Sequence, residues 1–499
     1  MDFLSNIALG FSVIAEPVNF FFCFTGVLLG TLIGVLPGLG PGATISLLLP
    51  LTYHLEPISS IIMVAGIYYG AKYGGSTTSI LLNIPGEVDS VVTCLDGYQM
   101  ARQGKAGRAL GISAFGSFIA GTFATLGLML VAPALARVAL SFGPPEMFSL
   151  MILALTLITF MSTGSQVKGL AMAALGLFLG SVGQDVFNNV DRFVFGFHFL
   201  LEGLGIVPVI VGLFGVGEVL SNLEAQMKGE VFQKRVSNLL PTWQDWKDSI
   251  WPIIRGTIVG FFVGIIPGGG GIASTFASYT IEKRVSKHPE KFGAGAIEGV
   301  AGPEAANNAC SGANFIPLMT LGIPTNGIMA VIFASLMING LQPGPLLIKN
   351  QPALFWGVIA SMYLGNVMLV LLNLPLIGIW VRFLTIPYSI LAPLILFFCL
   401  LGAYTVKNTV GDLIIMILFG VLGFLMRKFR YEGAPLIMGF VISDLMEGAF
   451  IRSLLISKGS FAIFFTKPIS CAVMIVALLL FVLPFFGKKP LKLGADDDN

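Results

Sequence analysis

Residues 30–45 read GTLIGVLPGLGPGATI, and residues 260–275 repeat the pattern as GFFVGIIPGGGGIAST. At a constant offset of 230 residues the two copies share the same residue at Gly30/Gly260, Gly34/Gly264, Pro37/Pro267, Gly38/Gly268, Gly40/Gly270 and Ala43/Ala273. In each copy an apolar run is interrupted by proline and glycine and then resumes. Because proline lacks a backbone donor and glycine is a poor helix former, we expect a helix to open at this point in each copy.

A second pair of interruptions follows in the same order. Residues 73–86 read YGGSTTSILLNIPG, and residues 310–325 read CSGANFIPLMTLGIPT. Gly75 aligns with Gly312, and an Ile-Pro dipeptide follows in both copies. The chain is therefore interpreted as a duplication, and the small polar residues of each copy predict a break in the middle of a helix.

Composition places the chain in a membrane. Hydrophobic residues make up 55% of it, charged residues only 11%, and the mean hydropathy is +0.89, which excludes an ordinary soluble domain. Many apolar runs approach the roughly 20 residues needed to span a bilayer. A net charge of +2 without a long basic tract argues against a nucleic-acid partner. There is no Walker A sequence and no G-x-S-x-G elbow, so we expect neither an enzyme nor a bound cofactor.

Apolar runs and polar loops divide the chain into five parts: a first membrane repeat (1–221), a cytoplasmic linker (222–249), a second membrane repeat (250–460), an extra C-terminal transmembrane helix (461–487) and a polar, disordered tail (488–499). The loops at 102–108, 228–247, 283–291 and 427–430 are basic, which places them in the cytoplasm. If each Pro-Gly run is a re-entrant hairpin, both halves have one hairpin and five crossings, in opposite orientations. The predicted fold is therefore an all-α polytopic membrane protein with two inverted repeats. Counting the hairpin arms as full spans would give a different topology.

The interruptions predict a binding site. In lipid, an open backbone is tolerated only where it is buried in protein or faces a wet cavity, and matched breaks in two halves point to a transporter's binding site. Half-helix N-termini suit a carboxylate, and free carbonyls and hydroxyls suit Na⁺. The alternative is that the small residues only allow close helix packing. The candidate substrate- and ion-binding residues are Pro37, Gly38, Gly40, Gly42, Lys72, Gly74, Gly75, Ser76, Thr77, Thr78, Asn83, Pro267, Gly268, Gly269, Gly270, Asn307, Asn308, Ser311, Gly312, Asn314, Pro324 and Thr325.

Charged residues within apolar segments need a separate explanation, because such groups are usually functional or paired. Lys72 has three candidate roles: attracting an anionic substrate, pairing with an acid such as Glu304, or extending to the membrane surface. Glu304 would either cap a helix or pair with a cation. Glu447 and Arg452 are expected to form a structural pair near a helix end.

Three blocks of the sequence, residues 30–53, 68–101 and 299–327, closely resemble the large membrane subunit of the tripartite tricarboxylate transporters (TctA). The resemblance implies a bacterial inner-membrane carrier that imports carboxylates, such as citrate or a di- or aromatic carboxylate, using a Na⁺ or H⁺ gradient. It also implies a small membrane subunit and a periplasmic solute-binding protein as partners. By analogy with other hairpin-containing carriers we expect an elevator-like motion, with a periplasmic N-terminus and a cytoplasmic C-terminus. The alternatives are a stand-alone carboxylate symporter and a structural membrane subunit without transport.

Overall fold

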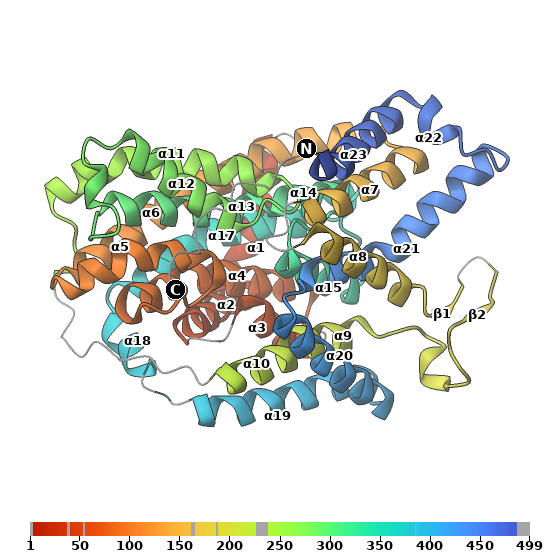
Figure 1. The fold of residues 1–499 in the computed structure, drawn as a ribbon, viewed down its shortest axis with the longest axis horizontal. Coiled ribbons are helices and arrows are strands. Elements are labelled where there is room, and N and C mark those ends of the chain that lie inside the picture. The colour runs from red at the N-terminus through yellow and green to blue at the C-terminus, as the bar shows by residue number, and fades with distance from the viewer. Residues whose placement is uncertain are drawn as a thin grey trace.

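The structure is a computed structural model that describes residues 3–36, 40–52, 55–160, 165–185, 188–225, 238–384, 386 and 388–486, and these residues are mostly helical (Figure 1). The helices of the first half are α1 (Phe3–Ala15), α2 (Pro17–Val35), α3 (Pro41–Thr52), α4 (Pro57–Leu82), η1 (Val88–Ser90), α5 (Val91–Arg102), α6 (Ala106–Ala139), α7 (Pro144–Phe160), α8 (Gln166–Gly180), η2 (His198–Leu200), α9 (Ile206–Ile210), the π-helical η3 (Val211–Val216) and α10 (Gly217–Ala225). Two short strands, β1 (Gly183–Gln184) and β2 (Asp191–Arg192), pair antiparallel between α8 and η2.

The first helix of the second half begins at Trp243, six residues before the predicted end of the linker, because Thr242 and Asp245 form a capping box that starts a helix there. Its helices are α11 (Trp243–Ile265), α12 (Gly271–Val285), η4 (Pro289–Lys291), α13 (Glu298–Ala313), α14 (Phe315–Leu321), α15 (Gly327–Ile338), α16 (Leu347–Asn350), α17 (Pro352–Asn373), α18 (Ile377–Phe383), α19 (Tyr388–Lys407), α20 (Val410–Lys428), α21 (Gly433–Ile456), α22 (Ile463–Thr466) and α23 (Pro468–Phe486). Residues 226–237 of the linker and the tail from residue 487 lie outside the described residues.

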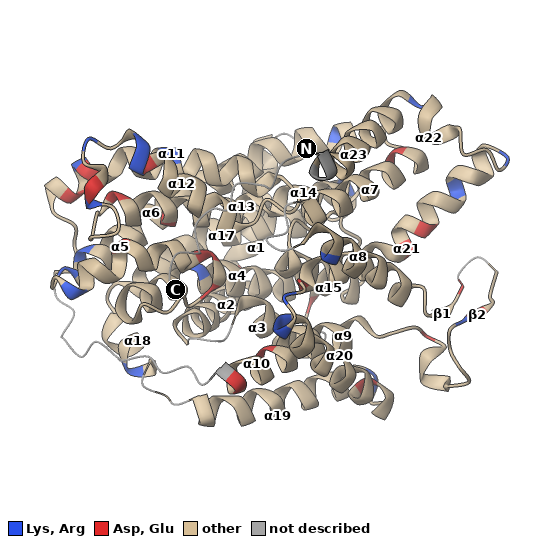
Figure 2. Cartoon of the chain, in the orientation of Figure 1, with Lys and Arg blue, Asp and Glu red and all other residues tan. Residues whose placement is uncertain are grey.

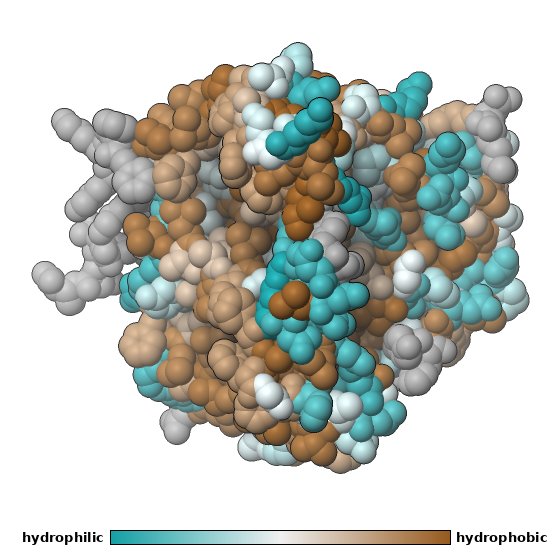
Figure 3. All heavy atoms as spheres, turned by 90° about the vertical axis from the view of Figure 1, so that its right-hand side faces the viewer, coloured by the Kyte–Doolittle hydropathy of each residue, from teal (hydrophilic) through white to brown (hydrophobic). Residues whose placement is uncertain are grey.

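The surface of these helices is apolar. Among the described residues, eight segments are long and apolar enough to cross a membrane: Pro17–Val35, Ala106–Ala139, Ile206–Glu224, Trp243–Ile265, Pro352–Asn373, Tyr388–Lys407, Val410–Lys428 and Gly433–Ile456. Large apolar side chains such as Phe397 on α19, Leu418 on α20 and Leu478 on α23 are more than half exposed, and Figure 3 shows broad hydrophobic areas on one face. Such a surface is stable in lipid and not in water, so the chain is a multi-pass membrane protein.

Both halves are built on the same helix pair. In the first half, a Cβ added at Gly26, Gly30 or Gly34 of α2 would collide with the backbone of α4 at residues 63, 67 and 71. In the second half the equivalent positions, residues 256, 260 and 264 of α11, meet the backbone of α13 at residues 302, 306 and 310. The offsets are constant, at 230 residues for the glycines and 239 for their contacts. The duplication seen in the sequence is therefore also a duplication of the closest helix packing in each half.

The Pro-Gly interruptions are confirmed as helix breaks. Helix α2 ends at Val35 and α3 begins at Pro41, while α11 ends at Ile265 and α12 begins at Gly271. In the second break, Gly268 and Gly270 have φ angles of +81° and +30°, in the region that favours glycine. That the two arms of each hairpin enter and leave on one side of the membrane stays a prediction.

The prediction for the second pair of interruptions is wrong in the first half and only partly right in the second, where the helix is interrupted at Asn314, at the end of the CSGAN cluster. Helix α4 continues without a break through Gly74 and Ser79, and α13 continues through Asn307 and Gly312. The small polar residues fit the helix because their hydroxyls bond within it, as Ser76 does to the carbonyl of Lys72 and Ser311 to that of Asn307.

The true interruptions lie a few residues further along the chain. Asn83 follows the end of α4 and Gly322 follows the end of α14, and both residues are left-handed, with φ of +58° and +70°. An Ile-Pro dipeptide comes next in each half, and we call Ile84-Pro85 the first Ile-Pro segment and Ile323-Pro324 the second. A residue that precedes proline is disfavoured in helical conformation, and this explains why both helices stop before the dipeptide. Residue Asn314 makes a smaller irregularity between α13 and α14.

A buried aspartate holds two basic loops together. Asp96 on α5 accepts backbone N–H bonds from Gly293, Gly295 and Ala296 at 2.8–2.9 Å, and a hydrogen bond from the Tyr279 hydroxyl at 2.9 Å. The loop that follows α5 and the loop that follows α12 therefore lie side by side. In Figure 2 several Lys and Arg residues lie at one end of the molecule, near α5 and α11, together with Asp and Glu residues.

Candidate functional site

The helix breaks of the two halves meet each other. At the start of α3, a side chain on Gly42 would lie 3.5 Å from Cγ1 of Ile328, just after the second Ile-Pro segment. At the start of α12, Gly271 lies directly against the carboxylate of Asp89, just after the first Ile-Pro segment. The helix that follows each Pro-Gly break therefore contacts the residues just after the Ile-Pro dipeptide of the other half. The sequence prediction that the four interruptions converge is supported for these described residues, with the Ile-Pro segments in place of the small polar clusters.

A buried group of charges lies beside the first Ile-Pro segment. The Lys72 ammonium is completely buried in α4; it donates to Glu87 Oε2 at 2.6 Å and also to Asp89 Oδ2. The Glu87 carboxylate accepts a further hydrogen bond, 2.8 Å long, from the Asn307 amide on α13. Of the three roles considered for Lys72, the structure shows pairing, but with Glu87 and Asp89 and not with Glu304. Glu87 directly precedes η1 and Asp89 lies in it, in a segment for which the sequence patterns predicted no role. The available signal was two acids, five and seven residues after the end of an apolar helix that carries a lysine.

A chain of side chains connects Lys72 to the second half. Its ammonium lies 5.5 Å from the centre of the Tyr68 ring, and the Tyr68 hydroxyl accepts a 2.9 Å bond from Asn314. The other end of the Asn314 amide accepts from the Thr325 hydroxyl at 2.9 Å. The carbonyl of Thr325 in turn accepts from the N–H of Gly268 at 2.7 Å. The first Ile-Pro segment is therefore linked through polar contacts to the second one and to the break between α11 and α12.

Glu304 lies in the interior of α13, so the expected capping role is wrong, and no side chain of the described residues forms an ion pair with it. Its carboxylate is completely buried and accepts hydrogen bonds from two hydroxyls, from Ser76 at 2.5 Å and from Thr93.

The break between α2 and α3 is held by an acid from α10. The backbone N–H of Gly40 donates to Glu218 Oε1 at 2.6 Å, and Arg427 of α20 donates to Oε2 of the same carboxylate at 2.8 Å. Thr78 of α4 donates to the carbonyl of Val35 at 2.7 Å, which satisfies an acceptor at the end of α2. The break is therefore stabilised on both sides by side chains from other helices.

Replacing Glu218 by Gln is expected to loosen this break. The Gly40 N–H keeps an acceptor, but the bond loses its charge and Arg427 loses its partner, which costs about 1–2 kcal/mol. Amide hydrogen exchange in the first turn of α3 should accelerate by roughly tenfold for each 1.4 kcal/mol lost. Glu224→Gln is the matched control, because its pair with Lys428 joins the same two helices but is about half exposed, and it should change exchange little. Equal exchange in both variants would contradict the role given to Glu218.

Other predicted site residues contribute to packing. A Cβ on Gly74 would collide with the backbone of α2, and one on Gly312 would come within 2.8 Å of Cβ of Ala124 on α6. Asn308 donates to Ser117 of α6 at 2.7 Å. Pro37 and Gly38 lie outside the described residues. The remaining candidates lie at or next to the converging segments, either in the helices (Gly75, Thr77) or in the breaks (Asn83, Pro267, Gly269, Pro324).

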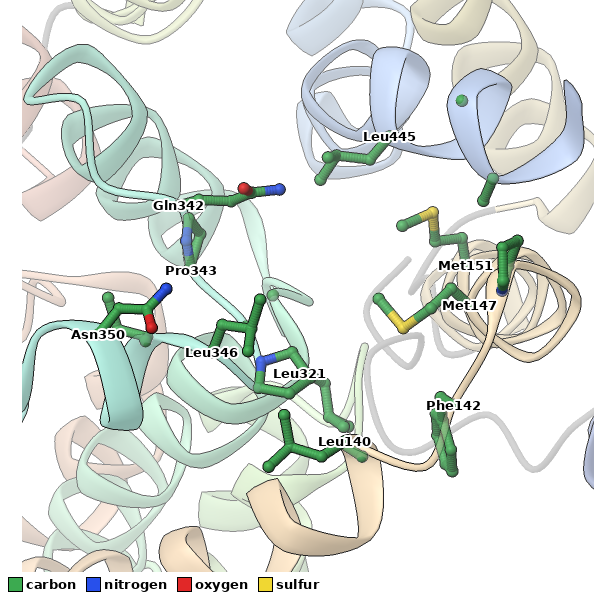
Figure 4. Close-up of a pocket in the computed structure, with 18 of the residues that line it drawn as sticks. Leu140, Phe142, Met147, Met151, Leu321, Gln342, Pro343, Leu346, Asn350 and Leu445 are labelled. Atoms are coloured by element: carbon green, nitrogen blue, oxygen red, sulfur yellow. The ribbon is translucent and has the colours of Figure 1, made fainter. Parts of the chain in front are cut away.

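A large cavity of the described residues lies elsewhere. It has a volume of about 570 Å³ and is lined by the end of α6, the start of α7, the end of α14, the loop before α16 and one side of α21. Figure 4 shows Met147 and Met151 on α7 facing Leu321 and Leu346 across it. Gly322, which ends α14, is the point where this cavity reaches one of the Ile-Pro segments. None of the candidate residues predicted from sequence lines it.

Arg452 lines this cavity too, and the predicted Glu447–Arg452 pair is not formed. Glu447 instead pairs with Arg192 of β2 at 2.7 Å, and Arg192 also binds Asp185. The two residues on α21 are five positions apart, so they do not face each other as residues three or four apart would.

Two duplicated halves, apolar spans and converging helix breaks are typical of a multi-pass membrane transport protein. The profile of the tripartite tricarboxylate transporter TctA family matches residues 20–438, so the chain belongs to that family. It is 51% identical over 501 residues to an uncharacterized 52.8 kDa protein in the TAR-I ttuC′ 3′ region of Agrobacterium vitis, and the match covers both chains completely. An uncharacterized protein in the TAR-II ttuC′ 3′ region of the same organism is 47% identical over 242 residues, which are 48% of this chain and all of that protein. No solved structure matches the chain.

Proposed function

We propose that the chain is the large transmembrane subunit of a binding-protein-dependent secondary transporter that imports carboxylates using a Na⁺ or H⁺ gradient. Membership of the TctA family over most of the chain is the observation that carries this proposal. The partners are a small membrane subunit and a periplasmic solute-binding protein, and the membrane is the bacterial inner membrane.

The helix termini at the breaks support a carboxylate as the ligand. A helix N-terminus offers free N–H groups and partial positive charge. The starts of α3 and α12 each lie against a carboxylate of the chain itself, Glu218 at Gly40 and Asp89 at Gly271. A substrate carboxylate has the same chemistry as these two side chains, so it can use the same kind of position once the surrounding segments move. We propose that one side of that site is formed by the two Ile-Pro segments together with Pro267, Gly268 and Thr325.

The distribution of charge supports the proposed orientation. Asp96 of α5 binds residues 293–296, and Gln103 donates to the carbonyl of Ala294 at 2.7 Å, which supports placing the basic loops at 102–108 and 283–291 on the same side of the membrane. The positive-inside rule makes that side the cytoplasm, with the N-terminus periplasmic and the C-terminus cytoplasmic. In this arrangement the two halves are inverted repeats, and the hairpins would carry the site across the membrane in an elevator-like motion.

The test is uptake of labelled carboxylates into proteoliposomes that contain this chain and its small membrane partner, under an inward Na⁺ or H⁺ gradient, with and without the binding protein. Uptake that requires both a gradient and the binding protein is the expected result. Uptake without the binding protein would replace the proposal with a stand-alone symporter. Absence of uptake by folded protein across tri-, di- and aromatic carboxylates would favour a structural subunit.

A further inference from the structure

Among the described residues of the converging segments, Glu304 is the buried acid that no cation neutralises. Three carboxylates gather there, those of Glu87, Asp89 and Glu304, and Lys72 supplies a single ammonium. Lys72 serves Glu87 and Asp89, Asn307 adds a donor to Glu87, and Asp89 lies at the N-terminus of α12. The described partners of Glu304 are neutral hydroxyls. A buried and unneutralised carboxylate is costly, so this group is the one that gains most from a bound cation.

The hydrogen bonds around Glu304 fit its protonated form. Ser76 Oγ lies 3.0 Å from the carbonyl oxygen of Lys72 and 2.5 Å from Glu304 Oε2, but a serine hydroxyl has only one proton to donate. When Glu304 is ionised, Ser76 donates to it and the bond to the carbonyl is lost. When Glu304 carries a proton, it donates to Ser76, and Ser76 donates to the carbonyl. The neutral acid therefore satisfies one more hydrogen bond than the anion does.

Titratable groups on the surrounding helices do not offer a positive charge in direct contact. Lys72 of α4 acts on Glu304 only through space, because its ammonium is bonded to the other two acids. Tyr73 of α4 and Cys94 of α5 also lie close enough to interact with its charge, and both are neutral groups. Ser113 of α6 adds a further hydroxyl.

A small cavity lies next to the same hydroxyls. Its volume is about 10 Å³, and Ser76, Thr77, Ser113 and Asn373 are among the residues that line it. That volume is close to the minimum for one water molecule. The side-chain amide oxygen of Asn373, Oδ1, is buried and has no hydrogen-bond partner in the described residues. Because this acceptor belongs to a residue that lines the same cavity as Ser76, we place a donor from outside the chain, such as water or hydronium, in that cavity.

We propose that Glu304 binds the coupling proton of this transporter, so that the coupling ion is H⁺ and not Na⁺. The proton adds to the Glu304 carboxylate through the cavity beside Ser76 and Asn373 and leaves by the same hydroxyls. A sodium ion does not fit this position, because the Ser76 and Glu304 oxygens are in direct hydrogen-bonding contact and leave no space between them. The proposal rests on the proposed transport function and names its coupling ion.

The test is an infrared pH titration of the purified full-length chain in lipid, which reads protonation of a carboxyl group and needs no substrate. We expect a carbonyl band of a protonated carboxylic acid that loses about tenfold in intensity for each pH unit above its midpoint. Glu304→Gln should remove the band. Glu298→Gln, a change of the same kind at the partly buried start of α13, should keep it. If Glu304→Gln does not fold, Thr93→Val is the substitute, and it should move the midpoint to higher pH because the anion loses a donor.

Three results would overturn the proposal. One is a band that persists unchanged in Glu304→Gln, and another is a midpoint unaffected by Thr93→Val. The third is loss of the band on adding NaCl, but not KCl, at constant pH, since this would show a sodium site. If the unchanged chain shows the carboxylic acid band but no carboxylate uptake in proteoliposomes, the proposed transport function is wrong, whereas protonation of Glu304 is still supported.

Discussion

Lys72→Met is expected to destabilise the folded chain by about 3–5 kcal/mol and to abolish uptake, because it leaves two acids in a buried site without their common cation. The loss should appear as a lower unfolding midpoint of the purified protein in lipid or detergent. Lys349→Met is the control, since Lys349 lies on the surface and its replacement removes the same charge from the chain.

A double replacement separates charge from packing. In Lys72→Met/Glu87→Gln one of the two acids is neutral, so part of the lost stability should return if the charge is responsible. If the double variant is as unstable as the single one, the pairing of Lys72 with Glu87 is not the cause. If the Lys72→Met protein is stable and fully active, the cluster of Lys72, Glu87 and Asp89 is not part of the functional site.

Gly260→Ala is expected to destabilise the second half by about 1–3 kcal/mol, because the added methyl group meets the backbone of α13 where α11 packs most closely. Gly30→Ala should have a similar effect in the first half, where the equivalent contact is with Ile67. Unfolding midpoints and the yield of folded protein measure both effects.

Gly378→Ala is the matched control for these two changes. Gly378 is an exposed residue of α18, and a Cβ there meets nothing within 4 Å. Alanine is a better helix former than glycine by roughly 0.5–1 kcal/mol, so this variant should be as stable as the parent or more so. If Gly260→Ala and Gly378→Ala have the same unfolding midpoint, the shared glycine positions do not determine the packing of the halves.

The duplication and the Pro-Gly breaks were predictable, because these residues act on the backbone itself. Glycine and proline change what conformations and hydrogen bonds are available locally, so their effect can be read without knowing the tertiary structure. The small polar clusters were misread as breaks for a related reason. Serine and threonine side chains can either compete with the helix backbone or bond to it four residues back, and the sequence does not show which of the two occurs.

The partners of the buried charges were not predictable. Lys72 was recognised as a residue in need of an explanation, but Glu87 and Asp89 reach it only because the chain turns back at Asn83. Glu218 meets Gly40 across a separation of 178 residues, for which the sequence contains no signal. Local patterns thus indicate where a site lies, whereas the identity of the contacting side chains depends on how distant helices are packed.

The length of helix α6 restricts how the chain can be placed in the bilayer. Its 34 residues extend over about 51 Å at 1.5 Å per residue, against a hydrocarbon core of about 30 Å. A helix of this length must incline steeply, bend at Pro133, or project into the headgroup layer on one or both sides. It packs against α4 and α5 of the first half and against α11, α13, α14 and α17 of the second. A change in lipid thickness that alters the inclination of α6 would therefore act on both halves together.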